Sequence, residues 1–182
     1  VFFTGLSDTF ADGDTVAHGQ AGEVAGDISS ERLAVRFPGN KGGTNCRVTE
    51  LSRAPPPPLP GGYAVGEKVY YTGASQTINT GDKVTHVQPG KVVGPDPGDS
   101  ARVAVMLEGN KGNINCLLTN LSRAPPPPLP GGYAVGEKVF FVWPSQTVTS
   151  GNKVTHGQVG KVTGPSQGGP KGLAVMFPGN KG

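Results

Sequence analysis

Three histidines and two cysteines are the side chains of this chain with the potential for nucleophilic chemistry. His18, His86 and His156 are each followed two residues later by a glutamine: Gln20, Gln88 and Gln158. A cysteine beside a histidine becomes a nucleophile when a third group orients the histidine. No such group occurs in a recognisable context, and catalytic sites are seldom repeated along an array. We therefore expect no enzymatic activity and no cofactor, and we assign the histidines to hydrogen-bonded turns or to contacts between modules.

Cys46 and Cys116 occupy the same position of an internal repeat, on a strand face shared with Val48 and Leu118. This position favours free, buried thiols. A disulfide between chains is an alternative. A metal site is disfavoured because the chain has no CxxC motif and no paired histidines at ligand spacing. Glycines are frequent, but no phosphate-binding motif occurs, and residues 39–42 are expected to form a hairpin tip.

The repeat organises the whole chain. The stretch Leu51–Val69, LSRAPPPPLPGGYAVGEKV, recurs unchanged at Leu121–Val139, so the period is 121 − 51 = 70 residues. The first copy is two residues shorter between Gly26 and Leu33, and a length change there indicates a surface loop. The chain opens and closes inside copies of the repeat, so we expect it to be a window of a longer array.

Apolar residues alternate within each copy, as in half-buried strands. Val103, Val105 and Leu107 form one such run, and the run 114–118 follows it. Between the equivalent runs of the first copy, Pro38-Gly39 predicts a type II turn and hence a β-hairpin. Adding 69–71, 83–86 and 91–93 gives five short strands, and no helical pattern exceeds one turn. We predict an all-β chain of tandem, five-stranded SH3-like barrels.

A run of prolines joins the predicted barrels. Proline fixes φ and disfavours the helical region for the residue before it, so Pro55–Pro60 predicts a polyproline II rod of roughly 19 Å. It serves as a spacer and can also dock on a barrel through aromatic side chains. Candidate packing aromatics are Tyr63, Tyr70, Tyr133 and Trp143. Residues 57–60 also fit a WW-domain ligand. The predicted divisions are a partial module 1–53, linker 54–62, module 63–123, linker 124–132 and partial module 133–182.

Composition excludes several classes of protein. Glycine (30) and proline (18) are frequent, whereas only 16% of residues are charged and the net charge is +3. This charge is too weak and too evenly spread for a nucleic-acid footprint. No apolar run approaches the roughly 18 residues of a membrane span, so none is expected in this window. Asn120-Leu121-Ser122 is an N-glycosylation acceptor, usable if the protein is secreted.

Two resemblances follow from these motifs. The order G-x-K-V, G-D-x-V-x-H-x-Q-x-G-x-V and V-A-V-x-F resembles SH3-like modules of the Tudor and Mind-bomb kinds. The contiguous prolines resemble extensins, the hydroxyproline-rich cell-wall glycoproteins of plants and algae, and point to an algal or protist surface protein. In that family such prolines are hydroxylated and carry short arabinose chains, although Arg53-Ala54 stands here in place of the usual serine. The resemblance implies glycosylation at Pro55, Pro56, Pro57, Pro58, Pro125, Pro126, Pro127 and Pro128.

Two functions remain open. The first is a structural protein of an extracellular filament or cell surface, with β modules as beads, proline rods as spacers or clamps, and self-association between neighbouring modules or chains. The second is an intracellular scaffold whose Tudor-like barrels bind a peptide or a modified lysine. Such binding requires an aromatic cage. Trp143 is replaced by Gly73 and Gly5 in the other copies, so a cage would not repeat, and the structural function is favoured.

Overall fold

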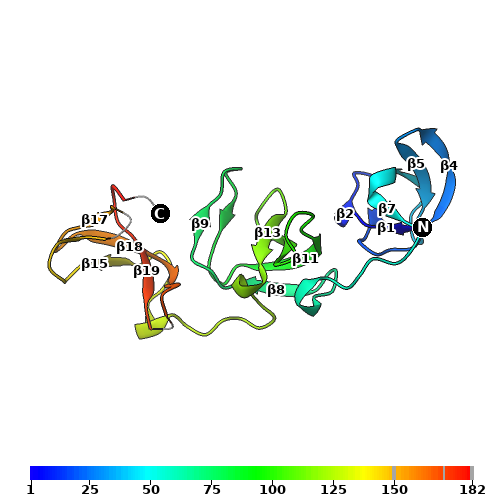
Figure 1. Cartoon of the computed structure of the whole chain (residues 1–182). Helices are drawn as coiled ribbons and strands as arrows, with labels where there is room; N and C mark the ends of the chain where they lie inside the picture. The colour runs from blue at the N-terminus through cyan, green and yellow to red at the C-terminus, as the bar shows by residue number, and fades with distance from the viewer. Residues whose placement is uncertain (149–150, 170, 181–182) are drawn as a thin grey trace. The chain divides into compact units, whose positions relative to one another are not determined.

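The computed structural model describes residues 1–148, 151–169 and 171–180, and in this part of the chain the fold is all-β (Figure 1). Its helices are single 3₁₀ turns: η1 (Val48–Glu50), η2 (Pro60–Gly62), η3 (Leu118–Asn120) and η4 (Pro130–Gly132). Five positions of the predicted third module 133–182 lie outside the described residues. The strands are β1 (Phe2–Phe3), β2 (Asp8–Thr9), β3 (Thr15–Val16), β4 (Glu23–Ser29), β5 (Arg32–Arg36), β6 (Gly43–Arg47), β7 (Leu51–Ser52), β8 (Lys68–Tyr71), β9 (Gln76–Thr77), β10 (Lys83–Val84), β11 (Pro89–Pro95), β12 (Arg102–Leu107), β13 (Ile114–Leu117), β14 (Leu121–Ser122), β15 (Lys138–Phe140), β16 (Gln146–Thr147), β17 (Lys153–Val154), β18 (Val159–Pro165) and β19 (Leu173–Met176).

The strands form several small sheets. The orders are β4-β5-β6, β13-β12-β11-β8-β14 and β15-β18-β19, with two-stranded pairs β1-β7, β2-β3, β9-β10 and β16-β17. None of the sheets in the described residues closes into a barrel, which differs from the predicted closed five-stranded unit. The first copy shows why: β6 ends at Arg47, the 3₁₀ turn η1 redirects the chain, and β7 pairs with β1 instead of extending the ladder of β4, β5 and β6.

The chain divides into two compact units, residues 1–68 with 90–118 and residues 69–89 with 119–182. The module and linker boundaries that the repeat indicates remain predictions. We use "module" below for the sequence copies 1–53, 63–123 and 133–182.

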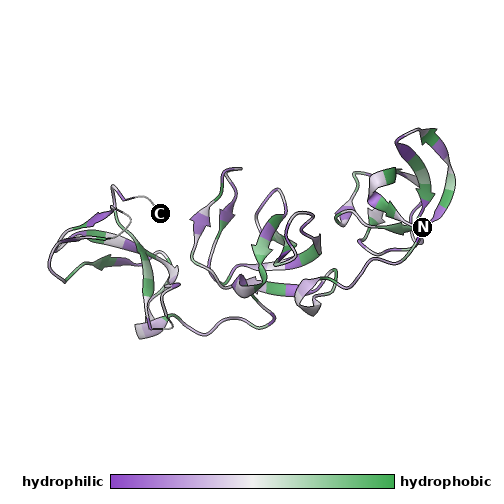
Figure 2. Ribbon diagram, in the orientation of Figure 1, coloured by the Kyte–Doolittle hydropathy of each residue, from purple (hydrophilic) through white to green (hydrophobic). Residues whose placement is uncertain are grey.

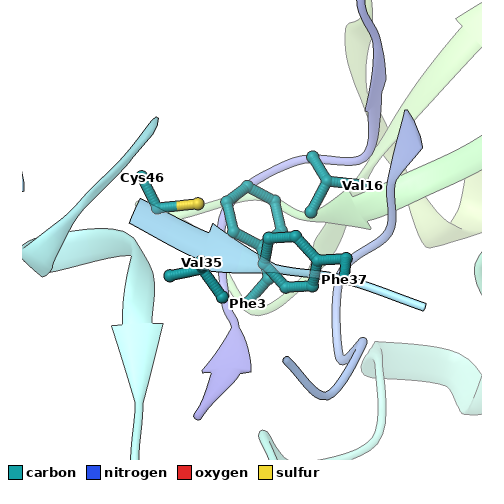
Figure 3. Packing of buried hydrophobic residues seen from close by; sticks show 5 residues of the cluster. All are labelled: Phe3, Val16, Val35, Phe37 and Cys46. Carbon is teal, nitrogen blue, oxygen red and sulfur yellow. The ribbon is translucent and has the colours of Figure 1, made fainter. Parts of the chain in front are cut away.

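Figure 3 shows the core of the first module. Along β5, Leu33 is half-buried and Val35 fully buried, while the arginines at both ends are exposed, as the alternation predicts. The same alternation of apolar and polar residues is visible along strands in Figure 2. The rings of Phe3 and Phe37 meet edge to face at 6.1 Å, an arrangement that aromatic quadrupoles favour. Cys46 completes this cluster as a buried free thiol, and Cys116 is also buried and free, which confirms the prediction.

The predicted hairpin between β5 and β6 is confirmed. The Asn40 amide donates to the Phe37 carbonyl at 3.2 Å, and Gly39 has φ +92°, a value that favours glycine in a type II turn. The side chain of Asp14, which the sequence did not single out, fixes the tip of this hairpin. Its carboxylate accepts the amides of Lys41 at 3.0 Å and Gly42 at 3.4 Å.

A β-bulge interrupts one long strand of each module. The pairing of β11 with β12 shifts between Val92 and Gly94, and that of β18 with β19 shifts between Val162 and Gly164. In β4 the corresponding shift falls at Ala25. A bulge places an extra, unpaired residue in one strand and bends it. The residues at the shift are therefore Ala25, Val93 and Thr163, at matching positions of the repeat.

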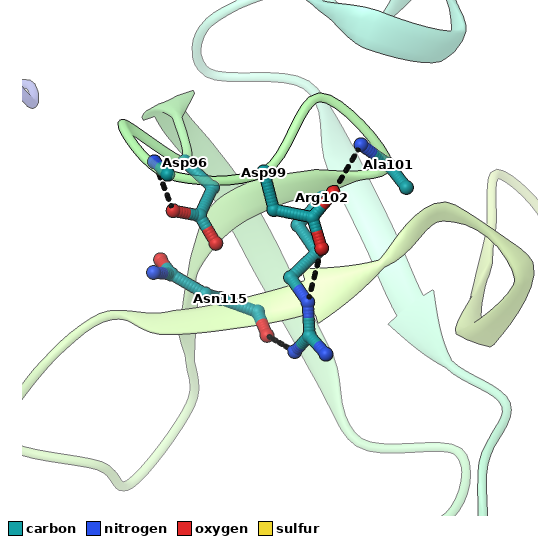
Figure 4. A network of polar contacts seen from close by, with 6 residues as sticks. Asp96, Asp99, Ala101, Arg102 and Asn115 are labelled. Atoms are coloured by element: carbon teal, nitrogen blue, oxygen red, sulfur yellow. Dashed lines mark hydrogen bonds and ion pairs between the residues drawn. The ribbon is translucent and has the colours of Figure 1, made fainter.

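The loop after β11 contains the two residues that the first module lacks, and a polar network holds it (Figure 4). The Asp99 carboxylate accepts the Ala101 amide at 2.8 Å and pairs with the Arg102 guanidinium at 3.0 Å. These two contacts, the amide first, lower the pKa of Asp99. Arg102 also donates to the Asn115 carbonyl on the neighbouring strand, so the longer loop is anchored to the sheet.

Candidate functional site at the module junctions

The repeated histidine holds a turn in the first module. The amide of His18 donates to the Ser7 hydroxyl at 2.9 Å, and its ring Nδ1 lies 3.1 Å from the carbonyl oxygens of both Thr4 and Gly5. A carbonyl oxygen only accepts hydrogen bonds, so Nδ1 carries the hydrogen. The histidine therefore ties residues 17–20, here called the histidine turn, to the segment 4–7, here called the serine loop.

The same contacts recur in the other two modules. The amides of His86 and His156 donate to the hydroxyls of Ser75 and Ser145, both at 2.9 Å. Nδ1 of His86 lies 3.0 Å from the Thr72 carbonyl oxygen, and that of His156 lies 3.3 Å from the corresponding oxygen of Trp143. The prediction that these histidines hold turns by hydrogen bonding is confirmed.

The glutamine two residues after each histidine closes the turn itself. The Gln20 side-chain oxygen accepts the Ala17 amide at 2.9 Å, and Gln88 and Gln158 accept the amides three residues before them in the same way. The other end of the Gln20 amide donates to the Pro38 carbonyl. The histidine turn is thus tied to the hairpin tip as well as to the serine loop.

The serine loop of each of the first two modules contacts the bulged strand of the following module. The Ser7 amide donates to the Val93 carbonyl at 2.8 Å, and the Ser75 amide donates to the Thr163 carbonyl at 2.7 Å. Both acceptors lie at the bulge, where the ladder of the strand is interrupted. These matched contacts, here called junctions, join consecutive modules through backbone groups at the same positions of the repeat.

Glycine is required beside each acceptor because the serine loop approaches closely. A Cβ on Gly94 would lie 2.9 Å from Leu6 Cδ2, and one on Gly164 would lie 2.9 Å from the Ala74 Cα. Both positions are buried. The histidine turn borders the same point, since the Cβ atoms of His18 and His86 lie 3.7 Å and 3.4 Å from these two Cβ positions. The sequence matches no protein-family model and no curated protein.

The proline segments border the histidine turns. Pro56 Cγ lies 3.6 Å from where a Cβ on Gly19 would be, so the segment touches the module that precedes it. Further along, a Cβ on Gly61 would lie 3.3 Å from Leu118 Cδ2 of the following module. The second segment shares an open groove with the second histidine turn, lined by His86, Val87, Pro126, Pro127, Pro128, Leu129 and Tyr133.

Burial follows a period of three in both segments. Leu59 and Leu129 are buried, Pro56 and Pro126 are half-buried, and the remaining prolines of the contiguous runs are exposed. The backbone of Leu59 has φ −62° and ψ 148°, close to polyproline II values. A polyproline II helix has three residues per turn, so residues three apart share a face. Pro56 and Leu59 therefore share the face that is covered.

The four candidate packing aromatics are placed differently. Tyr63 is buried, with its ring 3.1 Å from where a Cβ on Gly61 would be, and Tyr70 is half-buried on β8. Tyr133 is 41% exposed and lies along the groove of the second segment. Trp143 is 70% exposed, and only its carbonyl contacts the histidine turn among the described contacts. The candidate glycan acceptor Asn120 is half-buried, and its carbonyl accepts the Thr72 amide.

The titratable groups give no indication of a metal centre or a reactive thiol. In the described part of the chain, no group of three or more His, Cys, Asp or Glu side chains is arranged to hold a metal ion. Burial raises the pKa of the Cys116 thiol to about 11 and, together with Glu50, raises that of Cys46. A raised pKa disfavours the thiolate, which is the nucleophilic form. Among the same described residues, no helix is long and apolar enough to cross a membrane.

Sequence reasoning missed the serines and glycines of the junctions. Ser7 and Ser75 act through their backbone amides, which carry no side-chain signature. A signal existed for Gly94 and Gly164, because an isolated glycine within a strand pattern indicates a bulge or a close backbone approach. Their meaning depends on a residue of the preceding module, which the pattern of a single strand does not reveal.

Proposed function

We propose that this protein is a structural, non-enzymatic repeat protein of an extracellular fibre or cell surface, in which consecutive modules are joined both by a proline segment and by a junction. The observation that carries the proposal is the matched pair of contacts Ser7 to Val93 and Ser75 to Thr163. A contact that recurs between the same positions of successive repeats orders them relative to one another, as in solenoid proteins. The 70-residue repeat is then a structural repeat, built on an SH3-like module.

The proline segment supports the junction by limiting the chain between two modules. In this proposal the whole segment is a polyproline II rod, which loses little conformational entropy on docking because it is already extended. The short tether keeps the serine loop and the bulged strand at a high effective concentration, so a contact of small area suffices within the chain. Pro56 near the histidine turn and Gly61 near Leu118 place the two ends of the first segment against consecutive modules.

The extracellular location and the glycans belong to the same proposal. Pro55, Pro57 and Pro58 are exposed, and so are their counterparts in the second segment, which leaves room for sugars on these rings. Mass spectrometry of the native protein tests this point. We expect added pentose or hexose on the exposed prolines. Unmodified prolines together with a nuclear location contradict the extracellular assignment.

Replacement of Pro55–Pro58 by a Gly-Ser sequence of equal length tests the role of the segments. We expect circular dichroism to show folded modules, whereas small-angle scattering and electron microscopy lose the regular spacing between them. As a matched control, the exposed pair Ser29-Ser30 in the first loop is replaced by Gly-Gly, which should leave the spacing unchanged. Unchanged spacing or fibre order in the Gly-Ser variant contradicts the proposal.

A further inference from the structure

We infer that the junction also joins separate molecules: the serine loop of the third module of one copy, residues 143–145, docks on the bulge of β4 in a second copy. This inference rests on the proposed structural function and specifies how copies of the chain associate. The partner is a second copy because the chain carries both halves of the contact. In the first and third modules, these halves have no junction partner among the described residues.

The acceptor half is the bulge of β4. A Cβ on Gly26 would meet no atom within 4 Å, whereas Cβ atoms on Gly94 and Gly164 would meet the preceding serine loop at 2.9 Å. Every residue of β4 is exposed, including Ala25 at the register shift. The exposure of the neighbouring Val24 is not part of this argument, because its counterpart Val92 is bonded by residues 66–67 of its own module.

The donor half is already shaped for docking. The Ser145 hydroxyl accepts the His156 amide at 2.9 Å, the same contact that shapes the serine loops of both intramolecular junctions. Trp143, Pro144 and Ser145 are all exposed, whereas their counterparts Gly73, Ala74 and Ser75 are buried or half-buried. Pro144 lacks an amide hydrogen, but the donor in both junctions is the serine amide, which Ser145 retains.

The recurring contact tolerates the residues at these two halves. Position 6 of the first serine loop is leucine, and alanine occupies the same place in the second. The acceptors Val93 and Thr163 also differ in side chain, yet both accept through the carbonyl. Docking therefore needs a serine amide, an outward carbonyl and a glycine, and Ser145, Ala25 and Gly26 supply them. A contact between two different surfaces of one molecule is heterologous, and it extends from copy to copy without closing on itself.

Sedimentation velocity of the 182-residue chain over a concentration series tests the inference. We expect wild-type chain to associate, and Gly26→Val and Ser145→Pro each to raise the dissociation constant at least tenfold. Gly26→Val fills the acceptor at an open position, and Ser145→Pro removes the donor hydrogen. Two controls should associate as wild type: Gly42→Val, at another open glycine, and Ser145→Ala, which keeps the amide. Circular dichroism checks that each variant is folded.

A mixture of the two blocked variants gives the sharpest readout. Each is expected to be monomeric alone, but the intact serine loop of Gly26→Val fits the intact β4 of Ser145→Pro. The mixture should therefore form heterodimers and nothing larger. Self-association of Gly26→Val at wild-type strength, or absence of the heterodimer, overturns the inference while leaving the proposed function in place. A wild-type chain that stays monomeric at all concentrations also overturns it, and the proposed function is then judged by the spacing experiment alone.

Discussion

The amide nitrogen of Ser75 lies 2.7 Å from the carbonyl oxygen of Thr163, which belongs to the following module. Neither side chain takes part in this bond. It depends instead on a bulge that interrupts the pairing at Thr163 and on a glycine at 164 that lets the serine loop approach.

A side chain at Gly164 should open this junction. The Cβ of Gly164→Ala would lie 2.9 Å from the Ala74 Cα, and overpacking of this kind costs about 1–3 kcal/mol. We expect faster hydrogen exchange of the Ser75 amide, with little change in the β9-β10 hairpin. Gly26→Ala is the matched control, because the same position of the first module is open. Unaltered protection of the Ser75 amide in Gly164→Ala would contradict the assignment of the junction.

Relief of backbone strain at Val87 should stabilise the second histidine turn. Among the described residues, Val87 is the one non-glycine residue with positive φ (+71°), and glycine stands at the matching positions 19 and 157. A β-branched residue in the left-handed region costs about 1–2 kcal/mol. Val87 also lines the groove of the proline segment, so part of the gain in Val87→Gly is offset by lost contacts. Urea unfolding should show a gain of about 0.5–1 kcal/mol, and the reverse change Gly19→Val should destabilise.

Removal of the Asp14 carboxylate should weaken the first hairpin tip. The side chain is 9% exposed and accepts two backbone amides, so Asp14→Ala leaves both donors without their partner. We expect a loss of about 1–3 kcal/mol in the free energy of unfolding. Asp14→Asn should cost less, because an amide oxygen still accepts and asparagine stands at the matching position 152. Equal losses in the two variants would show that charge, and not acceptance, is what the tip needs.

High pH should destabilise the fold through Cys116. Its pKa is raised from 9.0 to about 11 in the folded chain, so the unfolded chain loses this proton first. The contribution of the thiol is fully present below pH 9 and is lost as the pH rises from 9 to about 11, an effect on the order of 2–3 kcal/mol. Urea unfolding at pH 8 and pH 10.5 measures it. Cys116→Ala is less stable at pH 8 but should lose less on raising the pH, and a parallel loss in both chains would refute this origin.

The sequence allowed the strands with regular alternation to be predicted, because burial of one face imposes that pattern. Val103, Val105 and Leu107 lie buried on β12, and the turn at Gly39 has the expected positive φ. The two-residue strand β9, Gln76–Thr77, was missed because two residues show no periodicity. The predicted strand 83–86 ends at Val84, since His86 belongs to the histidine turn.

Closure and the junctions were beyond sequence reasoning for a different reason. Whether a ladder closes depends on how a short connection such as η1 directs the next strand, and the residues Val48–Glu50 show no strong preference that would indicate it. The bond from Ser7 to Val93 joins residues of two modules, and its acceptor is defined only by the bulge. In contrast, the buried cysteines and the hydrogen-bonded histidines were correctly inferred from their repeated positions.

The use of peptide groups at the junctions has a consequence for how such a gene can change. Duplication of a repeat inserts a unit that already carries an amide at one end and a carbonyl beside a glycine at the other, so the new copy fits its neighbours at once. Leucine, alanine and proline succeed one another at positions 6, 74 and 144. Drift at such sites leaves the joint intact, and the length of the array becomes free to vary between individuals while its assembly rule stays the same.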